Sequence, residues 1–569
     1  MRSGRVALAL AASTLAVTAC GGIPTSGQIV PHEEIDTEDT IVDVGGEAQA
    51  PLPGDTPEGI VYGFLEAMTF YEPNYETARK FMTPAAAREW QPDVATTIYD
   101  SEPMIEPVDA GRVRLTLTVA ATLESSRDYT RAEEGTEREY ELELQPVNGE
   151  WRITNPPAGL VIRDADFDAE FRSYSLFYFD SSFSALVPDP VYLPARGRVA
   201  TLLAQELLEG PSTWLAPATA TAFPEGTRLA VDAVTVTNGE ADVRLSENAL
   251  EGTEEQRAQL VSQLAWTLGQ LRNVNDLVVH SGPRTLAETP VRRLPEADPA
   301  QVPTPHLFAV TEAGLVRFED ADTVGPVPGP LGEFERAAEV VEVAVDLRMA
   351  EAVVVDEGRG SMIWSELTGT GELTIIAEGQ ELRSPSFDRT GLVWVVEGTG
   401  TDSRLLVAAP PPAAEPVEVS AAALAGRSIE AVALSADGAR IAIVSEGNVY
   451  VGVVVRTGWP AEVRVENLRR VEGSQIDGVS ADVAWNHPNE LAVLVSGDED
   501  TGMAQRAYLI ALGTMTISSQ GEVPGAGSIT ANWREPRGLV AGGPDFVLRQ
   551  QPTLDWALVD AVRLPTFPG

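Results

Sequence analysis

The sequence predicts a multidomain protein of the α+β and all-β classes, in which two mixed helix-and-strand domains precede a C-terminal β-propeller. Its length of 569 residues corresponds to about three or four domains. Up to about residue 288, apolar residues at helical spacing alternate with short strand patterns. From about residue 300 a strand–turn–strand unit repeats instead, which is typical of propeller blades.

The first 19 residues have the organisation of a signal peptide. After a basic start, the apolar run Val6–Val17 has twelve residues, too few to span a hydrocarbon core of about 30 Å. Val17-Thr18-Ala19-Cys20 then matches a bacterial lipobox, and Cys20 is the only cysteine of the chain. We expect residues 1–19 to be removed and Cys20 to be lipidated, which anchors the protein on the extracytoplasmic face of the cell membrane. The alternative is an ordinary signal peptide with an incidental cysteine.

The composition of the chain limits the classes of molecule that the protein can bind. Residues 20–55, the lipidated N-terminus and an acidic flexible tether, are rich in acid, glycine and proline. The whole chain has 40 basic and 85 acidic residues, a net charge of −45. Such a surface repels phosphate backbones and anionic headgroups, so we expect no nucleic acid partner and a membrane contact made by lipid alone.

Residues that carry common catalytic chemistry are scarce. Lys80 is the only lysine and follows no glycine loop, which excludes a P-loop and a Schiff-base cofactor. The four histidines, His32, His280, His306 and His487, form no zinc-binding pattern, and no G-x-S-x-G motif occurs. The sequence therefore predicts no enzyme, no cofactor and no metal ion.

Two acidic runs have the residue types of calcium loops without the full pattern. In the run Asp164, Asp166, Asp168 and Glu170, Ala169 occupies the position where the loop needs glycine. We expect this run to be a solvated linker between domains. Asp498–Asp500 is expected to be a surface loop.

The first predicted domain covers residues 56–168. Thr56 and Pro57 have the form of an N-cap and first helical position. Strands are expected at 113–123 and 140–144, and Asn148-Gly149 predicts a hairpin turn. This order of helices and strands resembles the α+β cone of the nuclear-transport-factor-2-like (NTF2-like) superfamily. Without an acid–base pair, we expect it to act as a scaffold.

The second predicted domain covers residues 172–288. It is expected to contain strands at 173–179, 187–193, 229–236, 241–245 and 274–280, a helix that ends at Gly210, and a helix that begins with a Thr253–Gln256 capping box. Three of its segments resemble the sporulation-and-germination (GerMN) domain, an α/β unit. These segments are Leu207–Pro211, Phe223–Thr227 and Gly239–Val243. The resemblance implies no catalysis.

The third predicted domain, residues 300–569, is a five- or six-bladed β-propeller. Aligned on Val345, Phe387, Leu434, Trp485 and Trp533, its repeats are 42, 47, 51 and 48 residues apart. His306–Phe318 supplies strands to a sixth blade or closes the ring with Leu554–Val562. A long β-sandwich is the alternative fold.

The sequence also predicts the roles of individual residues in this region. Trp485 and Trp533 fall at strand positions, where packing in the core is expected rather than stacking on sugars. His487–Glu490 is expected to be a turn between strands, not a metal site.

The order of these parts, with Gly22-Ile23-Pro24-Thr25-Ser26-Gly27 after the lipobox, resembles the LpqB family of actinobacterial lipoproteins over essentially the whole chain. The resemblance implies an accessory protein of the MtrA–MtrB two-component system that acts on the extracytoplasmic part of the sensor kinase MtrB and affects cell-wall homeostasis and division. Only Cys20 is carried over as a functional residue. Two alternatives stay open: a lipoprotein that binds cell-wall glycan or peptidoglycan without a kinase partner, and a hydrolase propeller.

Overall fold

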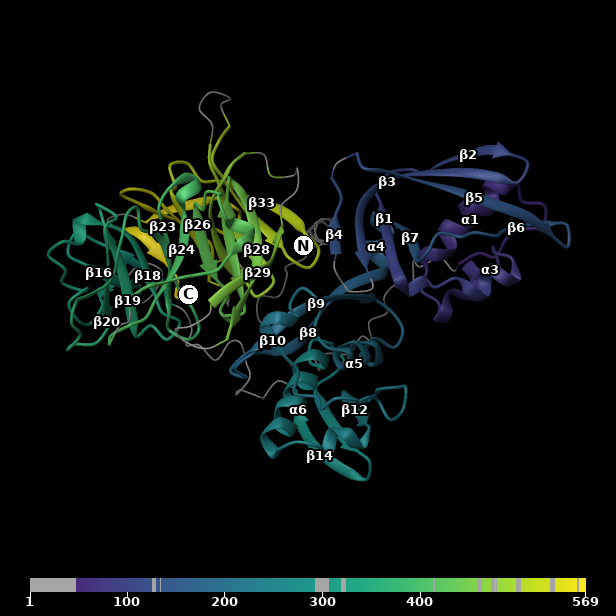
Figure 1. Ribbon diagram of the computed structural model, residues 1–569, viewed down its shortest axis with the longest axis horizontal. Helices are drawn as coiled ribbons and strands as arrows, with labels where there is room; N and C mark the ends of the chain where they lie inside the picture. The colour runs from purple at the N-terminus through teal and green to yellow at the C-terminus, as the bar shows by residue number, and fades with distance from the viewer. Residues whose placement is uncertain are drawn as a thin grey trace, which may run out of the picture. The chain divides into compact units, whose positions relative to one another are not determined.

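The computed structural model describes residues 48–124, 129–133, 135–291, 306–318, 324–412, 415–457, 463–471, 476, 478–497, 503–532, 538–559 and 562–569. Figure 1 shows the helices and strands of this part of the chain. The predicted signal peptide, Cys20 and most of the predicted tether lie outside the described residues, as do His32, Asp498–Asp500 and Trp533.

The N-terminal domain packs helices against a mostly antiparallel sheet, the α+β arrangement that the sequence predicts. Helix α1 (Pro57–Thr69) begins as predicted, because the Thr56 hydroxyl accepts a hydrogen bond from the Gly59 amide at 3.2 Å. Its apolar face is fully buried. The other elements are α2 Glu76–Arg79, α3 Pro84–Glu89, β1 Ala95–Tyr99, β2 Met104–Asp109, β3 Arg112–Glu124, β4 Tyr129–Arg131, β5 Glu137–Val147, β6 Glu150–Ile153 and β7 Leu160–Arg163.

The sheet of this domain has the order β6-β5-β3-β1-β7, with β2 and β4 paired to β3. The predicted Asn148-Gly149 turn joins β5 to β6, with φ of 54° and 88° at the two residues. Asparagine and glycine tolerate this left-handed backbone, so the prediction is confirmed. The sequence did not predict β1, β2 or β7, of which β2 is largely exposed and shows no alternation of apolar residues.

The acidic run between the first two domains is a helix, so the prediction of a solvated linker is wrong. Helix α4 (Asp164–Glu170) buries Phe167, whose ring stacks on Phe171 with centroids 5.0 Å apart. Glu170 is 7% exposed and pairs with Arg196 at 3.2 Å. Acidic residues in the first turn stabilise a helix through its dipole. The buried ring of Phe167 holds this helix against the rest of the domain.

The second domain is an α/β unit. Helix α5 (Val199–Glu209) ends at Gly210 with φ of 101°. The predicted capping box begins α6 (Glu254–Leu268), because Thr253 and Gln256 exchange backbone-to-side-chain hydrogen bonds of 2.9 and 3.2 Å. The strands are β8 Phe171–Asp180, β9 Leu186–Pro194, β10 Thr219–Ala220, β11 Thr235–Thr237, β12 Glu240–Leu245, β13 Asp276–Ser281 and β14 Arg284–Pro290.

One predicted strand of this domain, 229–236, is wrong over most of its length. Only Leu229 forms a bridge, to Leu245, and regular pairing begins at Thr235. The Ala233 amide donates to the Val231 carbonyl, so a tight turn interrupts the segment, and Val231 is 53% exposed. The alternation of apolar residues therefore predicted a longer strand than the structure contains.

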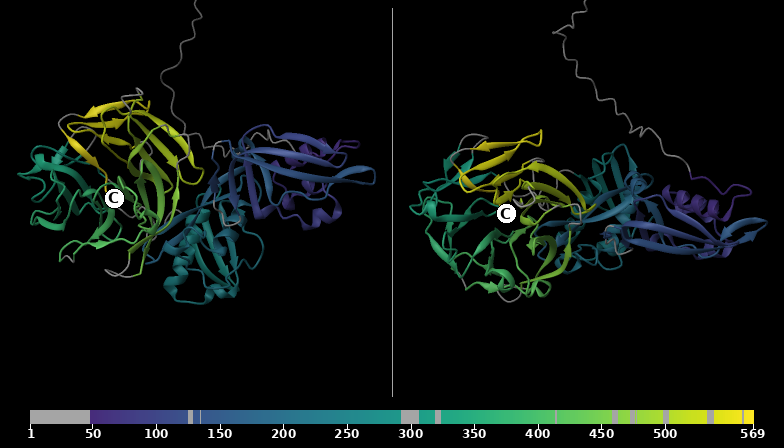
Figure 2. Two further views of the ribbon diagram at one scale, coloured as in Figure 1. Left: turned by 45° about the horizontal axis from the view of Figure 1, so that its top comes forward. Right: turned by 90° about the horizontal axis from the view of Figure 1, so that it is seen from above.

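The C-terminal region forms a six-bladed β-propeller over its described residues, within the predicted range of five or six. Each blade has four strands, and we number the blades along the chain: blade 1 (β15–β17 with β38), blade 2 (β18–β21), blade 3 (β22–β25), blade 4 (β26–β29), blade 5 (β30–β33) and blade 6 (β34–β37). Figure 2 shows the blades around a centre near which the chain ends.

The ring closes between the two ends of this region. The last strand, β38 (Arg563–Thr566), pairs with β15 (Phe308–Val310) and completes blade 1. His306–Phe318 therefore supplies strands to a blade additional to the five repeats seen in the sequence, as one of the two predictions had it, and this blade is blade 1 in our numbering. Leu554–Val562 does not close the ring, since its strand β37 (Trp556–Val559) is the outer strand of blade 6.

The first strand of each of blades 2 to 6, together with β38, faces the centre, and these six inner strands contact their neighbours around the ring. The remaining strands are β16 Leu315–Phe318, β17 Val324–Pro326, β18 Val340–Val345, β19 Glu351–Asp356, β20 Ser361–Glu366, β21 Thr374–Glu378, β22 Arg383–Phe387, β23 Val393–Glu397, β24 Arg404–Ala408, β25 Val417–Glu418, β26 Ala431–Leu434, β27 Arg440–Ser445, β28 Asn448–Arg456, β29 Val463–Arg470, β30 Ser480–His487, β31 Glu490–Val495, β32 Arg506–Ala511, β33 Thr516–Glu522, β34 Ser528–Thr530, β35 Val540–Gly542 and β36 Val547–Gln550.

Candidate functional site

The inner strands of the propeller surround a cavity of about 500 Å³, which we call the channel. All six blades contribute to its wall. Near the start of the inner strands the wall carries three carboxylates: Glu342 on β18, Glu430 directly before β26, and Asp482 on β30. Blades 2 and 5 are opposite each other in a ring of six, so Glu342 and Asp482 approach the channel from opposite sides.

Side chains at one equivalent position join three of the inner strands to the next strand around the ring. Glu342, Ser384 and Asp482 stand three residues before Val345, Phe387 and Trp485, the points on which the repeats align. The Glu342 carboxylate accepts the Ser384 amide, and the Ser384 hydroxyl accepts the Val432 amide at 2.8 Å. Asp482 accepts the Ile529 amide at 2.7 Å. The inner edge of a blade has no neighbouring strand, and these side chains satisfy its free amides.

The two opposed carboxylates differ in their charge partners. Arg359 forms an ion pair with Glu342, and burial nevertheless raises the pKa of Glu342. Burial raises the pKa of Asp482 to about 7, against the effect of the Ile529 and Val483 amides that donate to it. The charge of Glu342 adds to this rise. Among the residues that the structure describes, no basic side chain pairs with Asp482.

The opposite end of the channel is crossed by the last residues of the chain. The Phe567 amide donates to the Thr530 hydroxyl at 2.9 Å, and the Gly569 amide donates to the Val345 carbonyl at 3.0 Å. The Phe387 amide donates to the Gly569 carbonyl at 3.3 Å. This segment therefore connects blades 6, 2 and 3 where their inner strands end.

Trp485 lies in the channel wall, and its predicted role in packing is confirmed. It is 8% exposed, its indole N–H donates to the Ala433 carbonyl at 3.0 Å, and the Arg440 guanidinium lies 5.0 Å from its ring. Such a ring is not free to stack on a sugar. The His487–Glu490 segment is the predicted turn, between β30 and β31.

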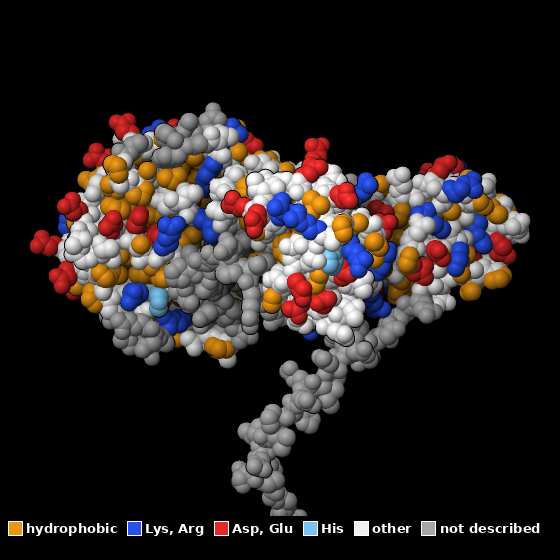
Figure 3. All heavy atoms as spheres, turned by 90° about the horizontal axis from the view of Figure 1, so that it is seen from below, with side chains coloured by type: hydrophobic (Ala, Val, Ile, Leu, Met, Phe, Trp, Pro, Cys, Tyr) orange, Lys and Arg blue, Asp and Glu red, His pale blue; other side chains and the backbone are white. Residues whose placement is uncertain are grey.

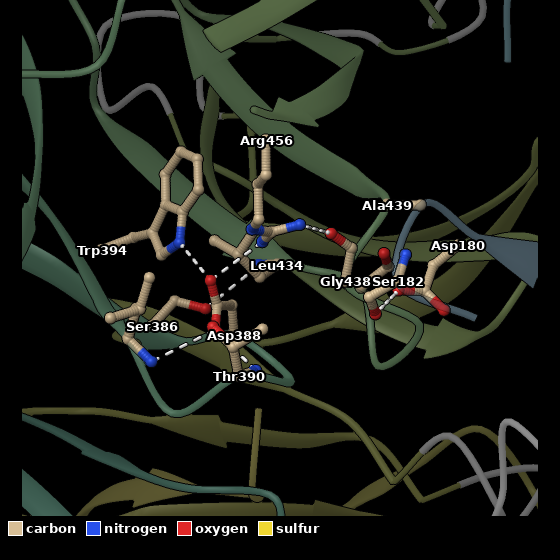
Figure 4. A network of polar contacts seen from close by, with 12 residues as sticks. Asp180, Ser182, Ser386, Asp388, Thr390, Trp394, Leu434, Gly438, Ala439 and Arg456 are labelled. Atoms are coloured by element: carbon tan, nitrogen blue, oxygen red, sulfur yellow. Dashed lines mark hydrogen bonds and ion pairs between the residues drawn. The ribbon is translucent and has the colours of Figure 1, made fainter. Parts of the chain in front are cut away.

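A second polar network lies at the turn between β22 and β23, centred on Asp388 (Figure 4). This carboxylate is 1% exposed and accepts the Trp394 indole at 3.0 Å and the Arg456 guanidinium at 2.8 Å. It also accepts the amides of Thr390 and Leu392 within its own turn. Arg456 lies on β28 of blade 4 and also donates to the Gly438 carbonyl of that blade. Its bond to Asp388 therefore joins blades 3 and 4.

The same turn chemistry recurs in neighbouring blades. Asp346 accepts the Ala350 and Glu351 amides at 2.6 and 2.7 Å, and Asp437 accepts the Ala439 amide at 2.9 Å. Each aspartate closes the turn between the first two strands of its blade. These residues are therefore structural, and they explain why aspartate recurs in the sequence repeat.

The other residues that the sequence analysis singled out form no common site. Lys80 caps the short helix α2, and His280 lies on β13 with a ring nitrogen 3.8 Å from Asp242. Within the described ranges, no group of three His, Cys, Asp or Glu side chains could hold a metal ion. Likewise, no described helix has the length and apolar character needed to cross a bilayer. Acidic and basic side chains are interspersed on the face shown in Figure 3.

Sequence reasoning missed Glu342, Glu430 and Asp482. The signal that could have found two of them is their shared offset from the alignment points of the repeat. Glu342 and Asp482, three residues before such points, line the channel, whereas the position of most of the 85 acidic residues in the sequence carries no such information.

Fold and site together define a multidomain protein with an α+β domain, an α/β domain and a propeller that encloses a channel lined by acidic and apolar residues. Family models match each part: the N-terminal domain of lipoprotein LpqB over residues 50–168, the sporulation and spore germination domain over 175–280, and the LpqB β-propeller domain over 313–568. The two LpqB models together match about two thirds of the chain. The chain belongs to the LpqB family.

Curated relatives support this assignment along the whole length. "Lipoprotein LpqB" of Streptomyces coelicolor is 29% identical, with 100% of this chain and 98% of the relative covered. That of Thermobifida fusca is 26% identical with full coverage of both, and that of Mycobacterium bovis is 27% identical over 72% of this chain and 73% of the relative.

Solved structures match more weakly. A nidogen/laminin complex aligns with a TM-score of 0.36 at 11% identity, over 47% of this chain and 98% of that one. TolB from Acinetobacter baumannii aligns with a TM-score of 0.35 at 11% identity, over 59% and 88%.

Proposed function

We propose that the protein is a lipid-anchored accessory protein on the extracytoplasmic face of the cell membrane that modulates the sensor kinase MtrB and thereby affects cell-wall homeostasis and division. The observation that carries this proposal is the match to LpqB lipoproteins along the full chain, with the three domains in the same order. The lipobox at Cys20 supplies the anchor, and the predicted tether of residues 20–55 separates the domains from the membrane.

The proposed role is binding rather than catalysis. The channel carboxylates Glu342 and Asp482 accept backbone amides of neighbouring blades, and Asp388 is held by Trp394 and Arg456. Each of these acids is thus bonded within the fold, and we assign none of them a catalytic role. We propose no enzymatic activity and no cofactor.

The proposed mechanism is a shift between two signalling states of the kinase. A bound protein can change this equilibrium only if its affinities for the two states differ. A tenfold difference in affinity corresponds to about 1.4 kcal/mol, enough to change kinase output markedly.

The test is binding of residues 21–569, without lipid, to the extracytoplasmic domain of the host's MtrB-type kinase at two salt concentrations. We expect saturable binding that survives moderate salt, and a changed autophosphorylation rate of full-length kinase in proteoliposomes. Kinase without its extracytoplasmic domain is the control and should not respond. Absence of binding to a folded kinase domain would contradict the proposal.

The anchor is tested separately by Cys20→Ala in the full-length chain. We expect the variant to leave the membrane fraction, whereas the native protein should partition into detergent. The alternative function, binding of peptidoglycan without a kinase, would be supported by co-sedimentation of residues 21–569 with purified walls. Trp485 is not available for it, because its ring is buried and its N–H is already used.

A further inference from the structure

We propose that the propeller channel binds a ligand with a primary amine, held by the carboxylate of Asp482. This site is separate from the proposed kinase contact and does not depend on it.

The channel has the size and lining of a ligand site. Its volume of about 500 Å³ lies within the range of about 300–1,000 Å³ found for small-molecule pockets. Apolar side chains such as Val432 and Leu564 share the wall with the three carboxylates and with Trp485. An alkyl stem fits such a wall, with its charged end at the carboxylates.

The charge balance of the channel favours a cation. Of the groups that face Asp482, Glu342 on blade 2 is paired with Arg359, and Glu430 on blade 4 accepts the Ser428 hydroxyl and, at 3.5 Å, the Gly447 amide. Blade 6 contributes only the Ile529 amide. The wall also carries His487 and a fourth carboxylate, Asp437, which pairs with Arg440. Among the described residues, the carboxylates of the wall therefore outnumber its basic side chains, and Asp482 has no basic partner.

The nearby Arg383 offsets part of this negative charge, because its guanidinium is attracted to Glu342 and Glu430. Its guanidinium donates to the Ile429 and Gly398 carbonyls and to the Ser403 hydroxyl. These bonds hold the guanidinium on blades 3 and 4, and among the described residues Asp482 still has no basic partner.

Both oxygens of Asp482 keep room for a ligand. One accepts the Val483 amide at 2.9 Å and the other the Ile529 amide at 2.7 Å. A carboxylate has about four acceptor sites, so about two are left for the N–H groups of an ammonium. The described residues hold no group fit for a metal ion, which favours an organic cation.

Proton exchange provides a distinctive signature. In the free protein the pKa of Asp482 is about 7, raised by burial and by Glu342. A bound ammonium stabilises the carboxylate form, so binding at pH 7 should release about half a proton per ligand. Affinity should increase as the pH rises from 6 to 8.

The experiment is titration calorimetry of residues 21–569 at pH 7 in two buffers of different ionisation enthalpy. The probes are N-acetyl-Ala-Lys-Ala-amide, the same peptide with Nε-acetyllysine, and spermidine. We expect the lysine peptide to bind with proton release and the acetylated peptide to bind at least about tenfold more weakly. Spermidine binding as tightly as the lysine peptide identifies a small amine as the ligand class, and weaker binding identifies a peptide.

Variants locate the site. Asp482→Asn should weaken binding by at least about tenfold and abolish proton release, and Glu430→Gln should weaken it by about threefold. Glu418→Gln, on the outer strand β25, is the matched control and should change affinity by less than about twofold. If Asp482→Asn fails to fold, Glu430→Gln, which replaces no bond between blades, carries the test.

Three results would overturn the proposal: no binding of the lysine peptide or spermidine, equal binding of the acetylated peptide, or unchanged affinity in the folded channel variants. A failure here leaves the kinase proposal untouched, because that proposal is tested with a different partner and readout.

Discussion

Two aspartates of the same propeller, Asp388 and Asp482, show how surroundings decide the role of a carboxylate. Asp388 is enclosed at a turn and neutralised by Arg456, with the Trp394 indole as a further donor. Asp482 borders the channel, accepts only backbone amides, and has a pKa raised to about 7. The first therefore stabilises the fold as an ion pair, whereas the second stays responsive to protons and cations.

The largest expected effect comes from Asp388→Ala. This change leaves the Arg456 guanidinium without its carboxylate and the Trp394 N–H without an acceptor, which should lower the free energy of unfolding by about 3–5 kcal/mol. Urea unfolding followed by tryptophan fluorescence measures it. The control Asp402→Ala, at an exposed position, should change stability by less than about 0.5 kcal/mol. Equal effects of the two substitutions would show that the Asp388 network is dispensable.

Ser386→Ala should have an intermediate effect. The Ser386 hydroxyl accepts the Leu434 amide at 3.0 Å across the seam between blades 3 and 4. Both residues are buried, so the lost acceptor should cost about 1–3 kcal/mol, again measured by urea unfolding. A native-like stability of this variant would argue that water replaces the hydroxyl.

Asp482→Asn should change the pH dependence of stability more than stability itself. The folded-state pKa of about 7 lies above the ordinary value of 3.8, so the folded protein keeps a proton that the unfolded chain loses as the pH rises from about 4 to 7. The stabilisation from this group is complete below pH 4 and is lost as the pH approaches and passes 7, with a slope of at most about 1.4 kcal/mol per pH unit.

We expect Asp482→Asn to flatten this slope between pH 4 and 7, measured by melting temperature across the range. Burial also raises the pKa of Glu342, so part of the slope should remain in the variant. An identical pH profile for variant and native protein would contradict the difference drawn here between the two aspartates.

The smallest expected effect is that of Glu418→Gln. Glu418 is 62% exposed in its side chain and lies 3.4 Å from Arg404, which also pairs with Glu397 at 2.6 Å. An exposed ion pair of this kind contributes less than about 0.5 kcal/mol and is screened by salt. A larger loss in thermal melting at low salt would show that outer strands also depend on charge pairs.

Local signals in the sequence were sufficient for several parts of the fold. Thr56, the Thr253–Gln256 capping box and the Asn148-Gly149 turn act through contacts within four residues, and the structure confirms each. The acidic run at 164–170 was misjudged, because its charges suggested solvent while the packing of Phe167 made a helix.

Strands with distant partners were harder to predict. β1 pairs in parallel with β7, and neither strand has a local turn that signals its partner. Closure of the propeller by Arg563–Thr566 depends on pairing with a strand at the other end of the domain. No periodicity within either segment reveals such a pairing, because its stabilisation appears only when the ring is complete.

The sequence by itself determined the lipobox expectation at Cys20, the order of the three domains and the propeller repeat, since these depend on composition, spacing and local turn chemistry. Only the tertiary structure decided that six blades close the ring and that Glu342 and Asp482 meet across a channel. It also decided that Asp388 is neutralised while Asp482 is not. The physical reason is that burial and charge pairing are set by residues far apart in the chain, and these surroundings determine what a carboxylate can do.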